Sequence, residues 1–264
     1  MKKYIFMAVA GMLALSSCSN DDNDQTTQNA PRQMTFTAGF GDEAQTRAAL
    51  NGSTKKVSFE AYDEISILSA NNANTTFTTT AGGASATFTG TATADSKFYA
   101  VYPYTDGLTL DPSTGIISGV EIPEAQFNAA GSTCGWDPRA PIAYATTTNT
   151  SLRFRNACAL LKINNDRGEA GIIVVSCHEA LTGTFSLNTS SGALSGTNTD
   201  NSAAVMQVPA NKTIYIAIAP GVKTDFEAVW DDGNGHHAMK EKSSFTFEAG
   251  KIYNLGNTSA WDAL

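Results

Sequence analysis

The sequence predicts an all-β protein, and three observations carry that prediction. Segments such as residues 34–40 alternate apolar and polar side chains with a period of two, the pattern of a half-buried strand. Turn-forming residues separate these segments at intervals of about ten residues. No stretch shows a convincing amphipathic-helix pattern. Short strands at this spacing are typical of β-sandwiches and β-barrels.

The expected strands follow one another along nearly the whole chain. In order they are residues 34–40, 64–69, 75–80, 86–91, 97–102, 160–164, 171–176, 183–187, 203–208, 213–219, 226–230, 244–248 and 252–255. Turn signals rich in Gly, Asp, Ser and Pro separate them at residues 81–84, 111–115, 166–168, 190–192, 220–221 and 231–235. Pro103 ends the aromatic strand before it, because proline has no N–H to donate.

The first residues have the layout of a secretion signal. Lys2 and Lys3 precede an apolar run over residues 4–15, and small residues then lead to Cys18. The run is too short to span a membrane. The small residues before Cys18 resemble a bacterial lipobox, at which the cysteine is acylated and residues 1–17 are removed. The alternative is a plain signal peptide with an incidental cysteine.

Residues 18–32 are predicted to be a spacer. Asp21, Asp22 and Asp24 make it acidic, and it shows no apolar periodicity, so it is expected to be disordered. An acidic run directly after a lipidated cysteine resembles the signal that exports Bacteroidetes lipoproteins to the outer face of the outer membrane. The alternative is a merely solvated linker. The expected location is therefore the outer membrane, on the cell surface.

The charge balance excludes some partners. The formal net charge is −8, and removal of residues 1–17, which contain two lysines and no acidic residue, leaves −10. An acidic chain without a basic stripe argues against nucleic acid and against anionic lipid headgroups. Cys134, Cys158 and Cys177 form no CxxC unit, which favours small buried side chains over metal or redox sites. Whether any two of them are bridged stays open.

No enzymatic arrangement emerges from the sequence. His236 and His237 follow a turn and lack an evident third metal ligand. Cys177 and His178 are adjacent on a strand, so their side chains are expected to point to opposite faces, out of reach of one another. We therefore expect no catalytic residue, no cofactor and no metal site. Exposed aromatic residues such as Tyr102, Tyr104 and Trp136 would suit a sugar ring, although β-sandwich cores use most such residues.

Several stretches together resemble the fimbrillin-like lipoproteins of Bacteroidetes, the type V pilin superfamily. Besides Cys18, they are, in the family's order, residues 36–38, 45–50 (QTRAAL), 60–68 (EAYDEISIL), 98–104 (FYAVYPY), 151–163 (SLRFRNACALLKI) and 247–255 (FEAGKIYNL). The resemblance implies two tandem transthyretin-like Greek-key β-sandwich domains. A Thr/Asn tract at residues 146–150 places them at residues 33–150 and 151–264.

The resemblance also implies how such a protein matures. An arginine-specific protease of the outer membrane cuts after an arginine near the start of the first domain, and the matching bond here joins Arg47 to Ala48. Cleavage would release the strand at residues 34–40 and expose a groove, which a strand from a neighbouring subunit would fill. In shaft subunits of the family the C-terminal segment is the donor. Here residues 256–264 contain Trp261 and Leu264, but the segment is short enough to pack on its own domain.

The expected function is that of a structural or tip subunit of surface fimbriae, which mediates adhesion. Its partners would be other fimbrial subunits, joined by a donor strand, and the membrane that holds its lipid anchor, with a host protein or a glycan as a further partner. The alternative is a surface lipoprotein that binds a glycan or a host protein and never polymerises. An enzyme is the third and most distant interpretation.

Overall fold

The computed structural model describes residues 30–41, 58–127, 135–196 and 202–263. Within these ranges the regular structure consists of β-strands and one turn of 3-10 helix, η1 (Thr258–Ala260). The all-β prediction is confirmed. Among the described residues no helix is long and apolar enough to cross a membrane.

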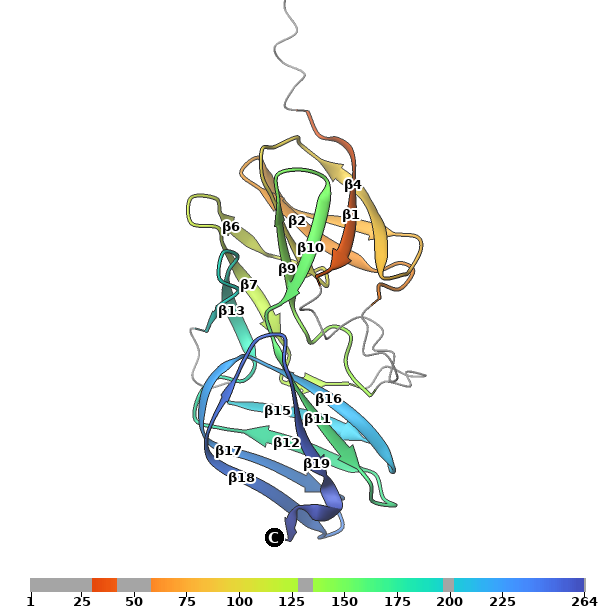
Figure 1. Cartoon of the computed structure of the whole chain (residues 1–264), viewed down its shortest axis with the longest axis vertical. Coiled ribbons are helices and arrows are strands. Elements are labelled where there is room, and N and C mark those ends of the chain that lie inside the picture. The colour runs from red at the N-terminus through yellow and green to blue at the C-terminus, as the bar shows by residue number, and fades with distance from the viewer. Residues whose placement is uncertain (1–29, 42–57, 128–134, 197–201, 264) are drawn as a thin grey trace, which may run out of the picture.

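Seven strands form a closed barrel in the upper part of Figure 1. Around the ring they are β1 (Arg32–Phe40), β10 (Ser151–Asn156), β9 (Ala143–Thr147), β5 (Phe98–Tyr102), β2 (Glu64–Ser69), β3 (Asn72–Thr79) and β4 (Ser85–Ala92). Hydrogen bonding therefore continues all the way round, so the sandwich expected for this part of the chain is closed into a barrel.

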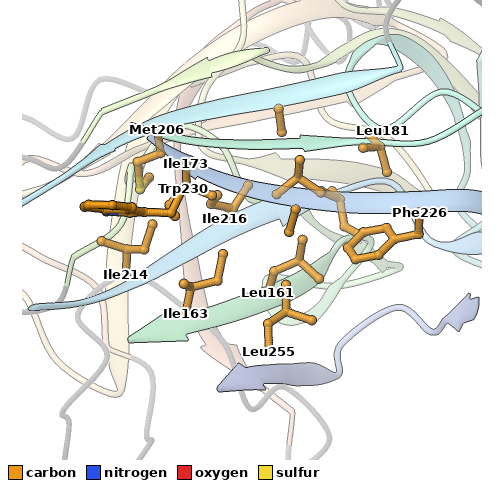
Figure 2. Packing of buried hydrophobic residues seen from close by; sticks show 14 of the residues in the cluster. Leu161, Ile163, Ile173, Leu181, Met206, Ile214, Ile216, Phe226, Trp230 and Leu255 are labelled. Carbon is orange, nitrogen blue, oxygen red and sulfur yellow. The ribbon is translucent and has the colours of Figure 1, made fainter. Parts of the chain in front are cut away.

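The lower part of Figure 1 contains two sheets packed face to face. The smaller consists of β16 (Lys212–Ile218), β11 (Ala159–Asn165) and β19 (Ile252–Asn257). The larger consists of β20 (Asp262–Ala263), β18 (His237–Phe247), β17 (Gly221–Asp231), β12 (Gly171–Ser176), β15 (Ala203–Val208) and β8 (Ala125–Gln126). Alternate residues of both sheets fill the space between them (Figure 2). Ile163 and Ile216 come from the smaller sheet, and Ile173, Met206 and Trp230 from the larger.

A third group of strands joins the barrel to the sandwich. It is a four-stranded sheet of β14 (Leu194–Gly196), β13 (Gly183–Asn188), β7 (Ile116–Ile122) and β6 (Thr109–Asp111). Its buried residues share one apolar cluster with residues of the barrel and the sandwich, including Tyr99, Leu160 and Ala217. The barrel and the sandwich are thus packed together through this cluster.

Strand β5 shows why an uninterrupted apolar run forms a strand here. All five of its residues are buried. Phe98, Ala100 and Tyr102 face the barrel interior, while Tyr99 and Val101 face the joining cluster. A strand buried on both faces needs no polar alternation, because neither face meets water.

The predicted strands are all present, with boundaries shifted by a few residues. The glycine turn at residues 81–84 connects β3 to β4, and the turn at residues 231–235 connects β17 to β18. The sequence-based list omitted β6, β7, β8, β9, β10, β14 and β20. Strand β10 begins at Ser151, where the second domain was predicted to start, yet it pairs with β9 and β1 of the barrel. The division of the chain into two domains stays a prediction.

Asp137 is a buried carboxylate beside the joint. It accepts hydrogen bonds from the backbone N–H of Phe127 at 3.0 Å and from the Arg139 guanidinium at 2.8 Å. Burial raises the pKa of Asp137, but the hydrogen bonds from Arg139 and Phe127 outweigh it, so the pKa lies below its usual value. The ionised carboxylate therefore links Phe127, which follows β8, to the loop with Arg139, which precedes β9.

The contact between the joining sheet and the barrel is testable with two glycines. Gly192 and Gly107 both have left-handed backbones, with φ of 79° and 72°. A Cβ at Gly192 would lie 2.3 Å from the Tyr144 hydroxyl of β9, whereas a Cβ at Gly107 meets nothing within 4 Å. Both alanine variants incur the left-handed cost of about 1–2 kcal/mol. Gly192→Ala should lose about 1–3 kcal/mol more, because Tyr144 must move.

Urea unfolding of the two variants beside the wild type measures this difference. Equal losses for Gly192→Ala and Gly107→Ala would show that Tyr144 does not pack on the turn after β13.

Candidate functional site

Strand β1 closes the barrel, and it is the first strand among the described residues. On one side it is antiparallel to β4, in register from Arg32↔Ala92 to Gly39↔Ser85. On the other side it is parallel to β10, from Thr37↔Ser151 to Phe40↔Phe154. Figure 1 shows β1 between these two strands. Removal of β1 would therefore open the ring between β4 and β10 and leave two strand edges unpaired.

The side chains of β1 alternate between the barrel interior and solvent. Phe36 and Ala38 are completely buried, and Met34 and Phe40 are partly buried against the same cluster. The threonines between them, Thr35 and Thr37, are exposed. This is the alternation that the sequence analysis predicted for residues 34–40.

The two phenylalanines of β1 enter separate groups of aromatic rings. The Phe36 ring packs edge-on against Phe77 at 5.4 Å and Phe98 at 5.2 Å, measured between ring centroids. The Phe40 ring stacks on Phe59 at 4.8 Å and contacts Phe154 at 5.8 Å. Full burial of one phenylalanine contributes about 1.5–3 kcal/mol, so β1 is held mainly by its side chains.

The segment that carries Arg47 and Ala48 leaves and rejoins the barrel at fixed points. After β1, the Gly41 N–H donates to the Phe154 carbonyl at 3.1 Å. Farther along the chain, Phe59 and Gly83 exchange two backbone hydrogen bonds of 2.8 and 2.9 Å. Arg47 and Ala48 themselves lie outside the described residues, as does Cys18. A cut after Arg47 would separate β1 covalently from the other barrel strands, since it falls between these two anchors.

A tight turn follows Phe59 and continues into β2. The Asp63 carboxylate accepts hydrogen bonds from the Glu60 N–H and the Tyr102 hydroxyl, both at 2.9 Å. Within the turn, between Glu60 and Asp63, Tyr62 adopts a left-handed backbone with φ of 71°, and its side chain is exposed. Sequence reasoning missed this turn because Tyr is not a usual residue for a left-handed position.

The C-terminal segment packs on its own sandwich. Trp261 belongs to the sandwich core, and its indole N–H donates to the Leu255 carbonyl at 3.2 Å. After it, β20 pairs with β18 through Met239↔Asp262 and Ala238↔Ala263. Leu264 lies outside the described residues. The sequence left two roles open for the segment with Trp261: donation to another subunit, or packing on its own domain. In the structure Trp261 packs on its own domain.

The other sequence candidates are not brought into a common site. Cys177 is buried and His178 exposed, as expected for neighbours on an extended chain. The thiol of Cys177 donates to the Glu179 carbonyl, and burial raises its pKa, which lowers its reactivity. Cys158 is buried in the joining cluster and Cys177 in the sandwich core.

The two histidines of the β17–β18 turn are each placed beside an aspartate. His236 lies 2.7 Å from Asp232, which raises the pKa of the imidazole, and His237 lies 3.5 Å from Asp231. In the described part of the chain no group of three or more His, Cys, Asp or Glu residues is arranged to hold a metal ion.

The aromatic residues considered for sugar stacking are mostly internal. Tyr102 is 3% exposed and Trp136 is 4% exposed, so neither offers a ring face at the surface. Tyr104 is half-buried. The expectation of exposed rings at Tyr102 and Trp136 was wrong, because both rings fill cores.

A hollow that the sequence did not predict lies between the free edges of β18 and β19. Its volume is about 170 Å³, and aromatic side chains such as Phe245 and Tyr253 line it. Lys240 crosses from β18 and donates to the Leu255 carbonyl at 2.8 Å, and the Lys242 ammonium lies 4.5 Å from the centre of the Phe245 ring. The two lysines thus stand at the edge strand of the sandwich.

Known proteins share this fold at low sequence identity. No family model matches the chain, and no curated protein matches it. A candidate cell-adhesion protein of Bacteroides uniformis superposes with a TM-score of 0.54 at 15% identity, over 88% of this chain and 96% of that one. A candidate cell-adhesion protein of Bacteroides ovatus gives 0.53 at 15% identity, over 89% and 96%. These likenesses extend over nearly the whole of both solved chains, and they show a common fold.

The contribution of β1 is testable through neighbouring positions on its two faces. Phe36→Ala should lower the free energy of unfolding by about 3–5 kcal/mol, because it leaves a cavity beside Phe77 and Phe98. Thr35→Ala changes an exposed side chain of the same strand and should cost less than about 1 kcal/mol. Urea denaturation of both variants checks the difference, and similar losses would mean that the inward face does not hold β1.

Proposed function

We propose that the protein is a lipid-anchored subunit of surface fimbriae, which acts in adhesion and joins other subunits by strand exchange after cleavage between Arg47 and Ala48. The observation that carries the proposal is the position of β1. It is the first of the strands that the structure describes, it closes the barrel, and one segment containing Arg47 connects it to the rest of the barrel.

The physical argument starts from the edges that β1 covers. Without β1, the backbone groups of β4 and β10 that now pair with it would lack partners, and the rings around Phe36 would meet water. Both changes are unfavourable. An extended segment of another subunit would relieve them by supplying backbone hydrogen bonds and alternating side chains.

The same contacts imply that cleavage alone does not release β1. Its buried phenylalanines and its pairing with β4 do not depend on the peptide bond after Arg47. A cut removes the tether, and an incoming strand must then compete for the same places. Exchange is therefore expected to need a donor of comparable fit, which gives the process its selectivity.

The packed C-terminus favours a tip or anchor subunit over a shaft subunit. A shaft subunit must both accept a strand and donate one. Here the described end of the chain is engaged with its own domain through Trp261 and β20. A terminal subunit needs only one half of the exchange.

The adhesion part of the proposal is supported by the solved structures. The proteins of Bacteroides uniformis and Bacteroides ovatus that share the fold are candidate cell-adhesion proteins. A cell-surface site of action agrees with Cys18 as the acylated residue and with the acidic spacer that follows it.

The non-polymerising alternative is favoured by one observation, the hollow between β18 and β19. An apolar hollow with a lysine rim would suit an apolar or acidic group of a bound partner. A chain that is cut after Arg47 and yet neither exchanges β1 nor forms larger assemblies would support this alternative.

Cleavage is tested on purified chain without its lipid, treated with an arginine-specific protease. We expect a cut after Arg47, identified by intact-mass spectrometry, and growth of larger species on size-exclusion chromatography when a donor subunit is added. Arg47→Lys removes the recognised side chain and keeps the charge, so this variant should stay uncut there. Arg153→Lys, in β10 of the barrel, is the matched control and should be cut at Arg47 like the wild type.

The lipid anchor is tested by Cys18→Ala in cells. The wild type should incorporate a labelled fatty acid and sediment with membranes, whereas the variant should do neither, because it lacks the thiol that is acylated. Equal membrane recovery of both would contradict an anchor at Cys18.

A further inference from the structure

We propose that the groove beneath β1 selects the replacing strand by side-chain size: between two aromatic side chains it accepts only a small one. The incoming segment then has the pattern aromatic–x–small–x–aromatic, where x is a residue that faces outward, and it runs antiparallel to β4. This inference rests on the strand exchange proposed above. It specifies the chemistry of the partner, an extended segment of a second subunit.

The two aromatic positions are defined by the rings that surround Phe36 and Phe40. The position of Phe36 is walled by Phe77 of β3 and Phe98 of β5. The position of Phe40 is walled by Phe59, Tyr102 and Phe154. Edge-on and stacked contacts of this kind favour a ring over an aliphatic side chain.

The small position is that of Ala38, which is completely buried. Its partners in register are Ala86 on β4 and Leu152 on β10. Its place between the two aromatic positions leaves Ala38 without the space that a ring would need. A larger side chain there must displace residues of a close-packed interior.

Strand β5, across the barrel, has the same succession of sizes. Its inward residues are Phe98, Ala100 and Tyr102. Phe36 contacts Phe98 at 5.2 Å and Phe40 contacts Tyr102 at 6.1 Å, which places Ala38 at the level of Ala100. Ala38 and Ala100 are thus small residues at one level of the barrel interior, with rings on both sides.

The direction of the incoming strand follows from the two ladders. The antiparallel ladder with β4 extends over eight register pairs, from Arg32↔Ala92 to Gly39↔Ser85, whereas the parallel ladder with β10 covers four. Antiparallel pairing is also slightly more stable per residue. A donor that keeps the direction of β1 retains the longer ladder.

The groove makes no such selection at the outward positions. Thr35 and Thr37 are exposed on the outer face of the barrel, so an apolar residue there gains nothing from the groove. Thr37 also provides a matched control for substitutions of Ala38, because it is the next residue in β1 and its side chain faces outward.

The test uses the full chain with a recognition site for a sequence-specific protease inserted between residues 42 and 57. Cleavage there leaves β1 held only by non-covalent contacts, so that it can exchange whether or not Arg47 is the natural site. After cleavage, a fluorescent peptide copying residues 32–41 is exchanged into the groove. Unlabelled peptides compete for it, and release is followed by anisotropy.

The unchanged peptide should displace the label, and the Thr37→Leu peptide should match it within about threefold. The Ala38→Leu peptide should be weaker by about tenfold or more, since overpacking a buried site has a cost of that order. The direction is read from a quencher at the N-terminus of the unchanged peptide, which should act more strongly on a fluorophore at residue 91 of β4 than on one at residue 85. Equal competition by the Ala38→Leu peptide would overturn the size selection, and stronger quenching at residue 85 would overturn the direction.

A second measurement keeps the two proposals separate. In the uncut chain, Ala38→Leu should lower the urea midpoint while Thr37→Leu leaves it nearly unchanged. If no peptide exchanges but this difference is found, strand exchange fails and the size restriction at Ala38 stands. If peptides exchange and the two variants are equally stable, the size selection fails and strand exchange stands.

Discussion

The structure of the barrel depends on the insertion of β1 between β4 and β10. The strand contributes backbone pairing on both sides and the side chains of Phe36 and Ala38 to the interior. Because a barrel has no free edges, each strand is needed to protect its neighbours. This closing strand is the first one described, and it is followed by the longest interval between two consecutive described strands, residues 41–63. The bond proposed for cleavage, after Arg47, falls in this interval.

The sandwich is a more self-sufficient unit, but it is not independent of the barrel. Strands between residues 109 and 126 come from the first half of the chain and pair with β13 and β15 of the second. The residues they bury join those of β5 in one apolar cluster. Separating the two parts would expose this cluster to water, so a load on the barrel is transmitted to the sandwich through packed side chains. That property suits a subunit held by its neighbours or by a membrane.

The sandwich and the barrel protect their strand edges differently. On the sandwich, Lys240 and Lys242 stand on the part of β18 beyond its short pairing with β20, and Lys240 is tied to β19 through the Leu255 carbonyl. Charged side chains on an edge strand discourage pairing with another chain. The closed barrel has no open edge while β1 is in place. The strand exchange proposed above would open an edge there, between β4 and β10.

The sequence by itself determined the all-β class, the alternation of β1 and the main turns, because these depend on local periodicity and on residues such as Gly, Pro and Asp. It also supplied Cys18, Arg47 and Ala48, which remain predictions outside the described residues. It did not determine that β10 closes the barrel beside β1, or that β7 and β8 pair with strands of the second half. Those pairings join residues far apart in the chain, and alternation fixes which face of a strand is buried but not which strand lies next to it. For the same reason the common level of Ala38 and Ala100 emerged only from the tertiary structure. An alanine in a strand has the same local pattern whether it faces a ring or another alanine, and only the packing across the barrel decides between them.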